Sequence, residues 1–434
     1  MDAARDAGLV RAVGPLGLAA SIVNSVVGAG IFVIPAAMAA GAGSQAPLAF
    51  LACGLGMGAI VLCFAEGGRR VPTSGGPYGY IEAAFGPVAG FVAGTLLWVG
   101  NVLACGSVAA ALGDGAASVL PPVFATAVHA VVILCTLGVV AAINVRGVAS
   151  GARFVGFATA VKLVPLFVFI VAGAMALNRA NLAAAAPPSV PGFGRAMILA
   201  VFAFTGMEIS LSASGEVARP ARTIPRALIT AMTFVTVLYV SIQVIAQGML
   251  GSSLPGSPAP LAEAMGRIHP LLRLLLLVGA TVSMFAWLGS DVLGAPRMLF
   301  AFARDGLLPS GLGRLHPRTH APYVAILCYA AIAALLALTG TFAELAVLAT
   351  LAIAALYLAG CASVWLLARR SAATGSPEPA LRWLNVAAAV GVASMLLVIA
   401  LATWTEIAGL GATVAISVLA YGLRHWLRRN RAHP

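Results

Sequence analysis

The chain has a single lysine, Lys162, and it lies inside an otherwise apolar stretch from Phe154 to Val171. An ionisable side chain in such a stretch costs about 3 kcal/mol to insert into a membrane and by default marks a functional site. Burial disfavours the charged form of an amine, so a buried lysine can gain and lose a proton in the physiological pH range. The structural alternative is a lysine whose ammonium group reaches the membrane edge, a role that arginines nearer the ends of the stretch can fill.

Glycines interrupt two other apolar stretches. Gly28 and Gly30 lie in the stretch at about residues 14–38, and Gly206 lies in the stretch at about residues 194–215. Glycine in a helix interior costs ~1 kcal/mol relative to alanine. Inside a membrane, the open backbone of an unwound helix is tolerated only where it lines a protein cavity. We therefore predict two broken helices that build a binding site at mid-membrane. The structural alternative is close helix packing against small residues. Glu208, beside the second interruption, is either functional or a hydrogen-bonding tie to neighbouring helices.

The elements that position these residues are membrane-spanning helices. Of the 434 residues, 61% are hydrophobic and 9% are charged, whereas a soluble domain carries ~25% charged residues. Apolar runs of about 20 residues indicate spanning helices. Twelve such runs are present, at about residues 14–38, 46–68, 87–112, 123–142, 153–177, 194–215, 226–249, 271–300, 322–339, 342–367, 383–403 and 405–424.

The arginines indicate how these runs cross the membrane. With the amino terminus inside, 20 arginines fall in cytoplasmic segments, and only Arg179, Arg195, Arg267 and Arg273 fall outside. Such a bias is typical of an even number of spans with both termini in the cytoplasm. The net charge of +12 is therefore a topology signal with anionic-lipid contact as a side effect, and it does not indicate nucleic-acid binding. We expect a multi-pass protein of the cell inner (cytoplasmic) membrane.

Other functional classes fit the sequence poorly. An enzyme is disfavoured because no metal-binding histidine motif or paired-carboxylate motif is present. A channel would need a repeated polar stripe along a pore, and no such stripe is found. No pattern indicates a cofactor, a metal or an oligomeric state. The histidines lie mostly in or near predicted loops: His129, His269, His316, His320, His425 and His433.

Four motifs, in order along the chain, resemble the amino acid–polyamine–organocation superfamily of secondary transporters. Together with the twelve runs, the resemblance covers essentially the whole chain. The motifs are GAGIF at 28–32 with Pro35; Glu66, PTSGGPYGY at 72–80 and AFG at 84–86; FAFTGME at 202–208 with Gly215, Glu216 and RTIPR at 222–226; and Arg297 with ARDGLLP at 303–309.

The resemblance implies alternating access and the LeuT-like fold. In that fold, an all-α polytopic membrane protein has twelve transmembrane helices, and a five-plus-five inverted repeat contains the broken helices 1 and 6. Residues 1–434 would form one transporter domain, with repeats at about 14–177 and 194–367 and extra helices at about 383–424. Two interrupted spans five positions apart are, independently, typical of an inverted repeat.

The resemblance also implies how a zwitterionic amino acid would bind. Amides of the first break would hold its carboxylate, carbonyls of the second would hold its amine, and an aromatic ring would gate the site. The partial charges of the helix ends agree with this arrangement. A helix is electropositive at its amino end, which suits the substrate carboxylate, and electronegative at its carboxyl end, which suits the amine. The implied residues are Ala29, Gly30 and Ile31 for the carboxylate, Phe202, Ala203 and Thr205 beside Gly206 for the amine, and Phe204 for the gate.

Lys162 matches a position where some members of the superfamily carry a lysine in place of a sodium ion. Its ammonium group would lie against carbonyls near Asn24 and Val27 and against polar groups of the eighth span such as Ser290. Asp291 departs from the family pattern, and three roles stay open for it: a pair with Lys162, selection of a substrate amine, or exposure to the cytoplasmic vestibule. Glu208 matches a frequent family acid.

These features predict a secondary active transporter that moves amino acids or amines across the membrane, coupled to protons with Lys162 as the cation mimic. The alternative is an exchanger of the same fold that swaps one amino acid or polyamine for another compound. Small apolar residues in the predicted pocket favour neutral substrates, whereas Glu208 and Asp291 leave cationic ones open.

Overall fold

The computed structural model describes residues 13–71, 76–118, 121–146, 152–183, 188–211, 217–304, 306–373 and 381–431, which are almost entirely helical. Parts of the family-like motifs, at 72–75, 212–216 and 305, lie outside these residues. The helices are α1 (Pro15–Val26), α2 (Gly30–Ala42), α3 (Ala46–Arg70), α4 (Pro77–Phe85), α5 (Pro87–Ala117), α6 (Pro122–Val145), α7 (Ala152–Ala176), α8 (Val190–Phe204), α9 (Met207–Leu211), α10 (Pro220–Leu250), α11 (Pro260–Gly266), α12 (Pro270–Gly294), α13 (Pro296–Arg304), α14 (Tyr323–Thr339), α15 (Phe342–Ala373), α16 (Leu381–Ala400) and α17 (Trp404–Arg431).

Each predicted apolar run coincides with one helix or with two consecutive helices. Within the described residues, nine helical segments are long and apolar enough to cross a membrane, and three shorter apolar helices accompany them: Pro15–Val26, Val161–Ala176 and Tyr323–Thr339. The chain is therefore an all-helical polytopic membrane protein. The count of twelve spans and the inverted repeat stay predictions.

Two segments between the long apolar runs contain short helices. The turn-rich segment after α3 leads into α4, which begins at Pro77. The Gly-, Ser- and Pro-rich segment before α12 holds the 3₁₀ helix η5 (Gly251–Gly256) and α11, which begins at Pro260. Proline suits the first helical position, where its missing N–H needs no partner and its φ is already helical. Pro77 and Pro260 thus mark helix starts.

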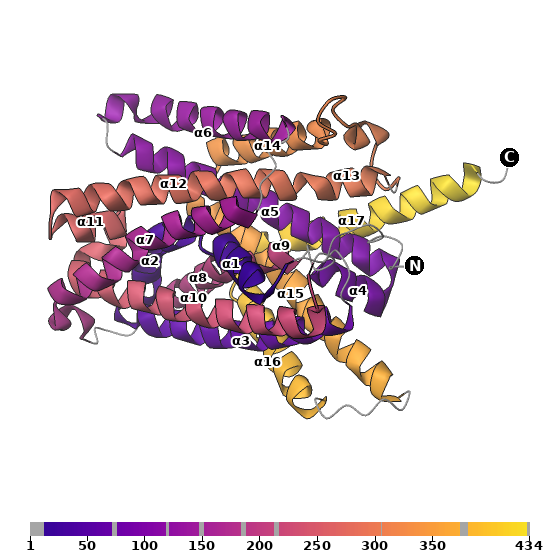
Figure 1. Ribbon diagram of the computed structural model, residues 1–434, viewed down its shortest axis with the longest axis horizontal. Coiled ribbons are helices and arrows are strands. Elements are labelled where there is room, and N and C mark those ends of the chain that lie inside the picture. The colour runs from indigo at the N-terminus through magenta and orange to yellow at the C-terminus, as the bar shows by residue number, and fades with distance from the viewer. Residues whose placement is uncertain are drawn as a thin grey trace.

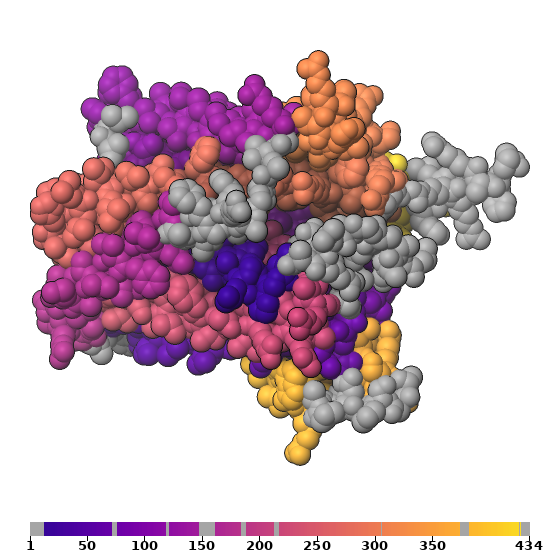
Figure 2. Space-filling model, in the orientation of Figure 1, coloured from indigo at the N-terminus to yellow at the C-terminus, as the bar shows by residue number. Residues whose placement is uncertain are grey.

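The interrupted helices lie in the interior of the bundle. Most helices run along the long axis of the molecule, with α6, α12 and α14 toward one side, α3 and α16 toward the other, and α1, α8 and α9 between them (Figure 1). In this interior α1 contacts α7, α9, α10 and α12, and α2 contacts α8. Figure 2 shows the first turns of α1, in indigo, reaching the surface in the middle of this face.

A buried carboxylate joins α3 to α15 at one end of the bundle. Glu66 accepts hydrogen bonds from Arg69 Nη2 at 2.6 Å and from Arg70 Nε at 2.7 Å. Arg70 in turn donates to the hydroxyl of Ser371 on α15, and Arg370 donates to the carbonyl of Ala84 at the end of α4. Because the carboxylate is buried and doubly paired, this motif residue has a structural role.

Candidate functional site

The first apolar run breaks where its glycines lie. Helix α1 ends at Val26, and α2 begins at Gly30. Around the break, the amide of Val27 donates to the Val23 carbonyl and that of Phe32 to the Ala29 carbonyl. Among the described residues, no acceptor pairs with the amides of Ala29, Gly30 and Ile31. Such free amides are expected in the first turn of a helix and give it a partial positive charge.

Three side chains from three different helices hold the carbonyls at the end of α1. Lys162 Nζ of α7 donates to the Asn24 carbonyl at 3.0 Å. Trp287 Nε1 of α12 donates to the Ser25 carbonyl, and the Tyr239 hydroxyl of α10 donates to the Val26 carbonyl, both at 3.0 Å.

The last carbonyls of a helix have no partners within it and carry its negative partial charge. Side-chain donors, one of them an amine, therefore substitute for the missing turn of helix. Lys162 is 1% exposed and Asn24 7%. The structure thus brings these two predicted residues together, whereas the described hydrogen bonds give Lys162 no contact with Val27 or Ser290.

The second break lies between α8 and α9. The amide of Thr205 and its hydroxyl both donate to the Phe202 carbonyl, at 3.2 and 2.8 Å. Gly206 has φ +119°, a conformation that side chains other than hydrogen rarely adopt. Its amide donates to both carboxylate oxygens of Glu208 at 3.0 Å.

Glu208 is buried and joins the second break to α15. Its Oε2 also accepts a hydrogen bond from the Tyr357 hydroxyl at 2.5 Å. The carboxylate accepts hydrogen bonds from the amide at the start of α9 and from a hydroxyl on α15. It therefore ties α9 to α15. This geometry matches the structural interpretation of Glu208 that the sequence left open.

The two breaks pack directly against each other. A Cβ atom on Gly206 would lie 2.6 Å from the Ser25 carbonyl oxygen, so only glycine allows the second break to approach the end of α1. A Cβ on Gly28 would lie 2.9 Å from Trp287 Cδ1, so this glycine makes room for the indole ring. The Ser210 hydroxyl of α9 lies 3.1 Å from that of Ser25. The breaks therefore form one structural unit.

A small cavity of about 20 Å³ lies between the breaks. That volume holds roughly one water molecule, so an amino acid can enter only if the surrounding helices move apart. Among the described residues, no charged side chain lines this cavity, and the polar groups of the lining are two hydroxyls, one indole and the backbone. Its lining residues are Ser25, Val26, Gly28, Ala29, Gly30, Ala104, Val108, Phe202, Ala203, Thr205 and Trp287.

Several predicted site residues lie near this cavity without lining it. Phe204, expected as a gate, is fully buried and packs against Tyr239 and Phe50, with ring centroids 5.3 and 6.3 Å apart. Ile31 is buried one residue beyond the lining, and Gly206 lies against α1 instead. The gating role of Phe204 therefore stays a prediction.

The two predicted residues of α12 face away from Lys162. Ser290 is exposed, and its hydroxyl donates to the Ala286 carbonyl of its own helix. Asp291 is 2% exposed and accepts a hydrogen bond from the Tyr329 hydroxyl of α14 at 2.6 Å. In the described residues no ion pair joins Asp291 to Lys162, and burial removes it from any vestibule.

Sequence reasoning missed four residues that shape the site: Trp287, Tyr239, Ala104 and Val108. A tryptophan in an apolar helix was a visible signal, because its indole N–H needs a partner when buried. Tyr239 carries the same signal. Ala104 and Val108 carry none, since small apolar residues are common throughout a membrane helix and only the fold brings α5 to the breaks.

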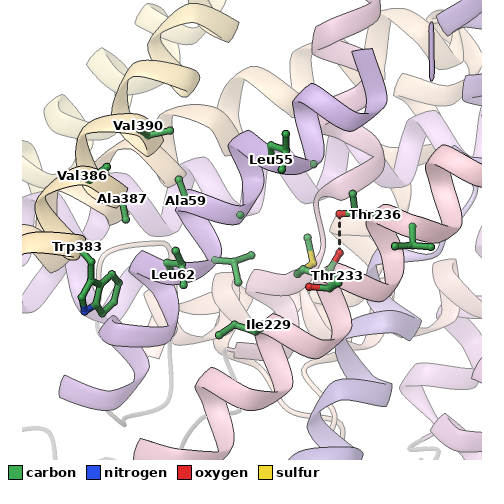
Figure 3. A pocket seen from close by; sticks show the side chains of 15 residues that line it. Leu55, Ala59, Leu62, Ile229, Thr233, Thr236, Trp383, Val386, Ala387 and Val390 are labelled. Carbon is green, nitrogen blue, oxygen red and sulfur yellow. Dashed lines mark hydrogen bonds between the residues drawn. The ribbon is translucent and has the colours of Figure 1, made fainter. Parts of the chain in front are cut away.

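A larger groove lies elsewhere, on the outer face between α3, α10 and α16 (Figure 3). It has a volume of about 760 Å³, and residues such as Leu55, Ile229, Trp383 and Val386 line it. No titratable side chain lines it. Since its walls are apolar and include exposed side chains such as Leu55, Trp383 and Val386, we do not assign substrate binding to it.

The chain matches known transporters over nearly its whole length. Residues 13–421 match the family model described as amino acid permease. An uncharacterized transporter of Mycobacterium tuberculosis is 31% identical over 429 residues, covering 95% of this chain and 92% of that protein. A serine/threonine exchanger of Bacillus subtilis is 28% identical, covering 84% of this chain and 85% of that protein. A methylthioribose transporter of the same organism is 28% identical, covering 69% of each chain.

The family match, over residues 13–421, covers both helix breaks, the anchoring residues of α7, α10 and α12, and the small cavity. The predicted superfamily is therefore confirmed, and the protein is a transporter of small molecules across a membrane and no enzyme. The chain belongs to the amino acid permease family.

Proposed function

We propose that this protein is a secondary active transporter that moves a small neutral amino acid across the cytoplasmic membrane by alternating access. The observation that carries the proposal is the small cavity between two broken helices, with free amides on one side and helix-end carbonyls on the other. The amides of Ala29, Gly30 and Ile31 would hold the substrate carboxylate, and the carbonyls of Phe202, Ala203 and Thr205 its amine. Both charges of a zwitterion would thus be neutralised by backbone.

The lining of the cavity supports a small, neutral side chain on the substrate. Ala104, Val108 and Gly28 leave an apolar space, and the hydroxyls of Ser25 and Thr205 can accept or donate one hydrogen bond. A cationic or acidic side chain would be buried there without a counter-charge, which is strongly unfavourable. Glu208 and Asp291, which left cationic substrates open, are both engaged elsewhere.

Lys162 is proposed to take the place of a coupling cation. Protonated, its ammonium group stabilises the negative end of α1 through the Asn24 carbonyl and so favours the arrangement in which α1, α7 and α12 are packed together. Deprotonated, it loses most of that attraction. Proton binding at Lys162 and closure of the site around the substrate would therefore reinforce each other.

The proposed fold is the five-plus-five inverted repeat, with twelve spans and both termini in the cytoplasm. Helices α1 to α7 would form the first repeat and α8 to α15 the second, with α16 and α17 outside it. The matched breaks after Val26 and after Phe204 support this division, because each lies in the first span of its repeat. Alternating access would then be a movement of the broken helices and their partners relative to the remaining bundle.

An exchanger is the second candidate, and the similarity to a serine/threonine exchanger favours it. In that mechanism the site reorients only when occupied. Lys162 would then be a permanent charge that holds α1, and external pH would change the rate little.

The test combines a binding screen with a transport assay. Purified protein is heated with glycine, alanine, serine, threonine, leucine, arginine or glutamate, since a bound ligand raises the apparent melting temperature. We expect the largest shift with one of the four small neutral amino acids. The same amino acid should enter proteoliposomes. Uptake driven by a pH gradient alone supports the symporter, and uptake only with internal amino acid supports the exchanger. A shift with arginine or glutamate alone, or with none of the seven, would contradict the substrate class.

A further inference from the structure

A second buried polar cluster lies outside the proposed binding site, between α5, α12 and α14. At its centre is Asp291, whose Oδ2 accepts the hydroxyl of Tyr329 at 2.6 Å. In the described part of the chain, its other oxygen, Oδ1, has no hydrogen-bond partner, and neither does Nε1 of Trp98. The Trp98 and Tyr329 rings meet edge to face with centroids 6.3 Å apart. Cys105 of α5 lies beside the carboxylate.

Within the described residues, no cation neutralises this carboxylate. Asp114 and His129 pair with each other, Lys162 donates to the Asn24 carbonyl, and Arg297 is exposed. No ion pair to Asp291 occurs among the described residues. The titratable or charged residues on the helices packed against α12 are Cys105 and Asp114 on α5, His129 and Cys135 on α6, Arg153 and Lys162 on α7, Glu263 on α11, Arg297 and Arg304 on α13, and Tyr323, Cys328 and Tyr329 on α14.

An ionised carboxylate in such a place is very unfavourable. Burying an unpaired charge costs so much that the group usually binds a proton instead. The Tyr329 hydroxyl offers one hydrogen bond and the neighbouring Cys105 thiol is only a weak donor, whereas a stable buried carboxylate accepts two or three good hydrogen bonds. Glu208 shows the contrast within the same molecule, because it accepts two contacts from the Gly206 amide and one from Tyr357.

We propose that Asp291 is a proton-binding site of this transporter, protonated in the packed conformation and ionised when α5, α12 and α14 separate enough to admit water. The O–H bond at Asp291 breaks on opening, the electron pair stays on the carboxylate, and water takes the proton. On closure the reverse occurs. The coupling part of this inference rests on the proposed transport function, whereas the protonation of Asp291 does not.

Two helices connect this site to the cavity between the breaks. On α12, Trp287 lies one turn before Asp291, lines the cavity and donates to the Ser25 carbonyl. On α5, Ala104 lines the same cavity, and Cys105 lies beside Asp291. Substrate entry requires these walls to move, because the cavity holds roughly one water. The same movement changes the packing around Asp291.

Infrared spectroscopy of the purified full chain tests the protonation without any ligand. We expect wild type at neutral pH to show the C=O stretch of a protonated carboxylic acid, and Asp291→Asn to lose one component of that band. Tyr329→Phe should move the component in frequency, because it removes the hydrogen bond from the Tyr329 hydroxyl to the group. Thr281→Val, an exposed position on the same helix, should change nothing. An unchanged band in both Asp291→Asn and Tyr329→Phe would overturn the proposal.

Transport in proteoliposomes tests the coupling. Asp291→Asn mimics the permanently protonated acid, so we expect counterflow of alanine to continue while uptake driven by a pH gradient falls at least tenfold. Gradient-driven uptake at the wild-type level, after loss of the infrared component, would show that Asp291 holds a proton but does not couple it, which overturns this half of the proposal. If wild type moves no amino acid at all, the proposed function fails, and the infrared result still decides the protonation.

Discussion

Replacing Gly206 with alanine tests whether the two helix breaks form one unit. Gly206 has φ +119°, and holding a non-glycine residue in such a region costs of order 1–3 kcal/mol. The added Cβ would also lie 2.6 Å from the Ser25 carbonyl oxygen. Because the clash is with backbone, the end of α1 must move.

Moving the Ser25 carbonyl weakens its hydrogen bond with Trp287 Nε1, which is 3.0 Å long. Such a bond contributes about 1 kcal/mol. The total is therefore roughly 2–4 kcal/mol against the packed arrangement of the breaks. This energy corresponds to roughly a 30- to 1,000-fold change in an equilibrium constant.

The assay measures unfolding in mixed micelles and uptake in proteoliposomes. Gly206→Ala should lower the free energy of unfolding by roughly 2–4 kcal/mol, the sum of the backbone strain and the weakened hydrogen bond. Its uptake rate should fall at least tenfold. Gly138→Ala is the matched control, because no atom lies within 4 Å of its Cβ position on α6. There, alanine should leave uptake unchanged and stabilise the helix by up to ~1 kcal/mol. Wild-type uptake and stability in Gly206→Ala would refute the close packing of the breaks.

Three further substitutions test the anchors of α1. Lys162→Ala should weaken the pH dependence of uptake in a folded protein, leaving the part that Asp291 contributes, measured across a series of external pH values; an unchanged profile would remove proton coupling through this lysine. Tyr239→Phe removes the donor to the Val26 carbonyl and should cost about 1 kcal/mol in unfolding, with a raised KM for uptake; equal KM values would argue against this anchor. Trp287→Ala should enlarge the cavity and raise the ratio of leucine to alanine uptake, and a constant ratio would show that the indole does not limit substrate size.

Much of the fold follows from local patterns in the sequence. The spanning helices could be predicted because long apolar runs have few alternatives in a membrane, where every backbone polar group must be paired internally. The breaks could be predicted because Gly28, Gly30 and Gly206 weaken helices in the middle of apolar runs. Helix ends were harder, since prolines such as Pro77 and Pro260 mark either a turn or the start of a helix.

The partners of the site residues could not be predicted in the same way. That Lys162 meets Asn24 followed from the family resemblance and from the need of a buried amine for an acceptor. That Ser290 faces outward while Asp291 contacts Tyr329 depends on how α12 is rotated against α5 and α14. The rotation of a helix that is apolar on all sides leaves no periodic signal in its sequence.

Phe204 illustrates how tertiary packing changes the role inferred for a residue from the sequence. Its position at the end of α8 suggested a gate, yet its ring lies in a buried aromatic cluster with Tyr239 and Phe50. Truncating a buried phenylalanine removes several kcal/mol of stability. Lost packing and a lost gate would therefore both lower uptake by Phe204→Ala. Measuring the folded fraction of the variant separates the two causes.

The most direct test of the central claim is protection of the cavity by substrate. Val108→Cys places a thiol of similar volume on the cavity wall, and Ser118→Cys places one at the exposed end of the same helix. Labelling by a water-soluble thiol reagent is followed by mass spectrometry, with wild type as the background. If an amino acid binds between the breaks, alanine at saturating concentration slows labelling at position 108 and leaves position 118 unchanged. Equal labelling rates at position 108 with and without alanine, in a protein that alanine stabilises, would show that the substrate binds elsewhere.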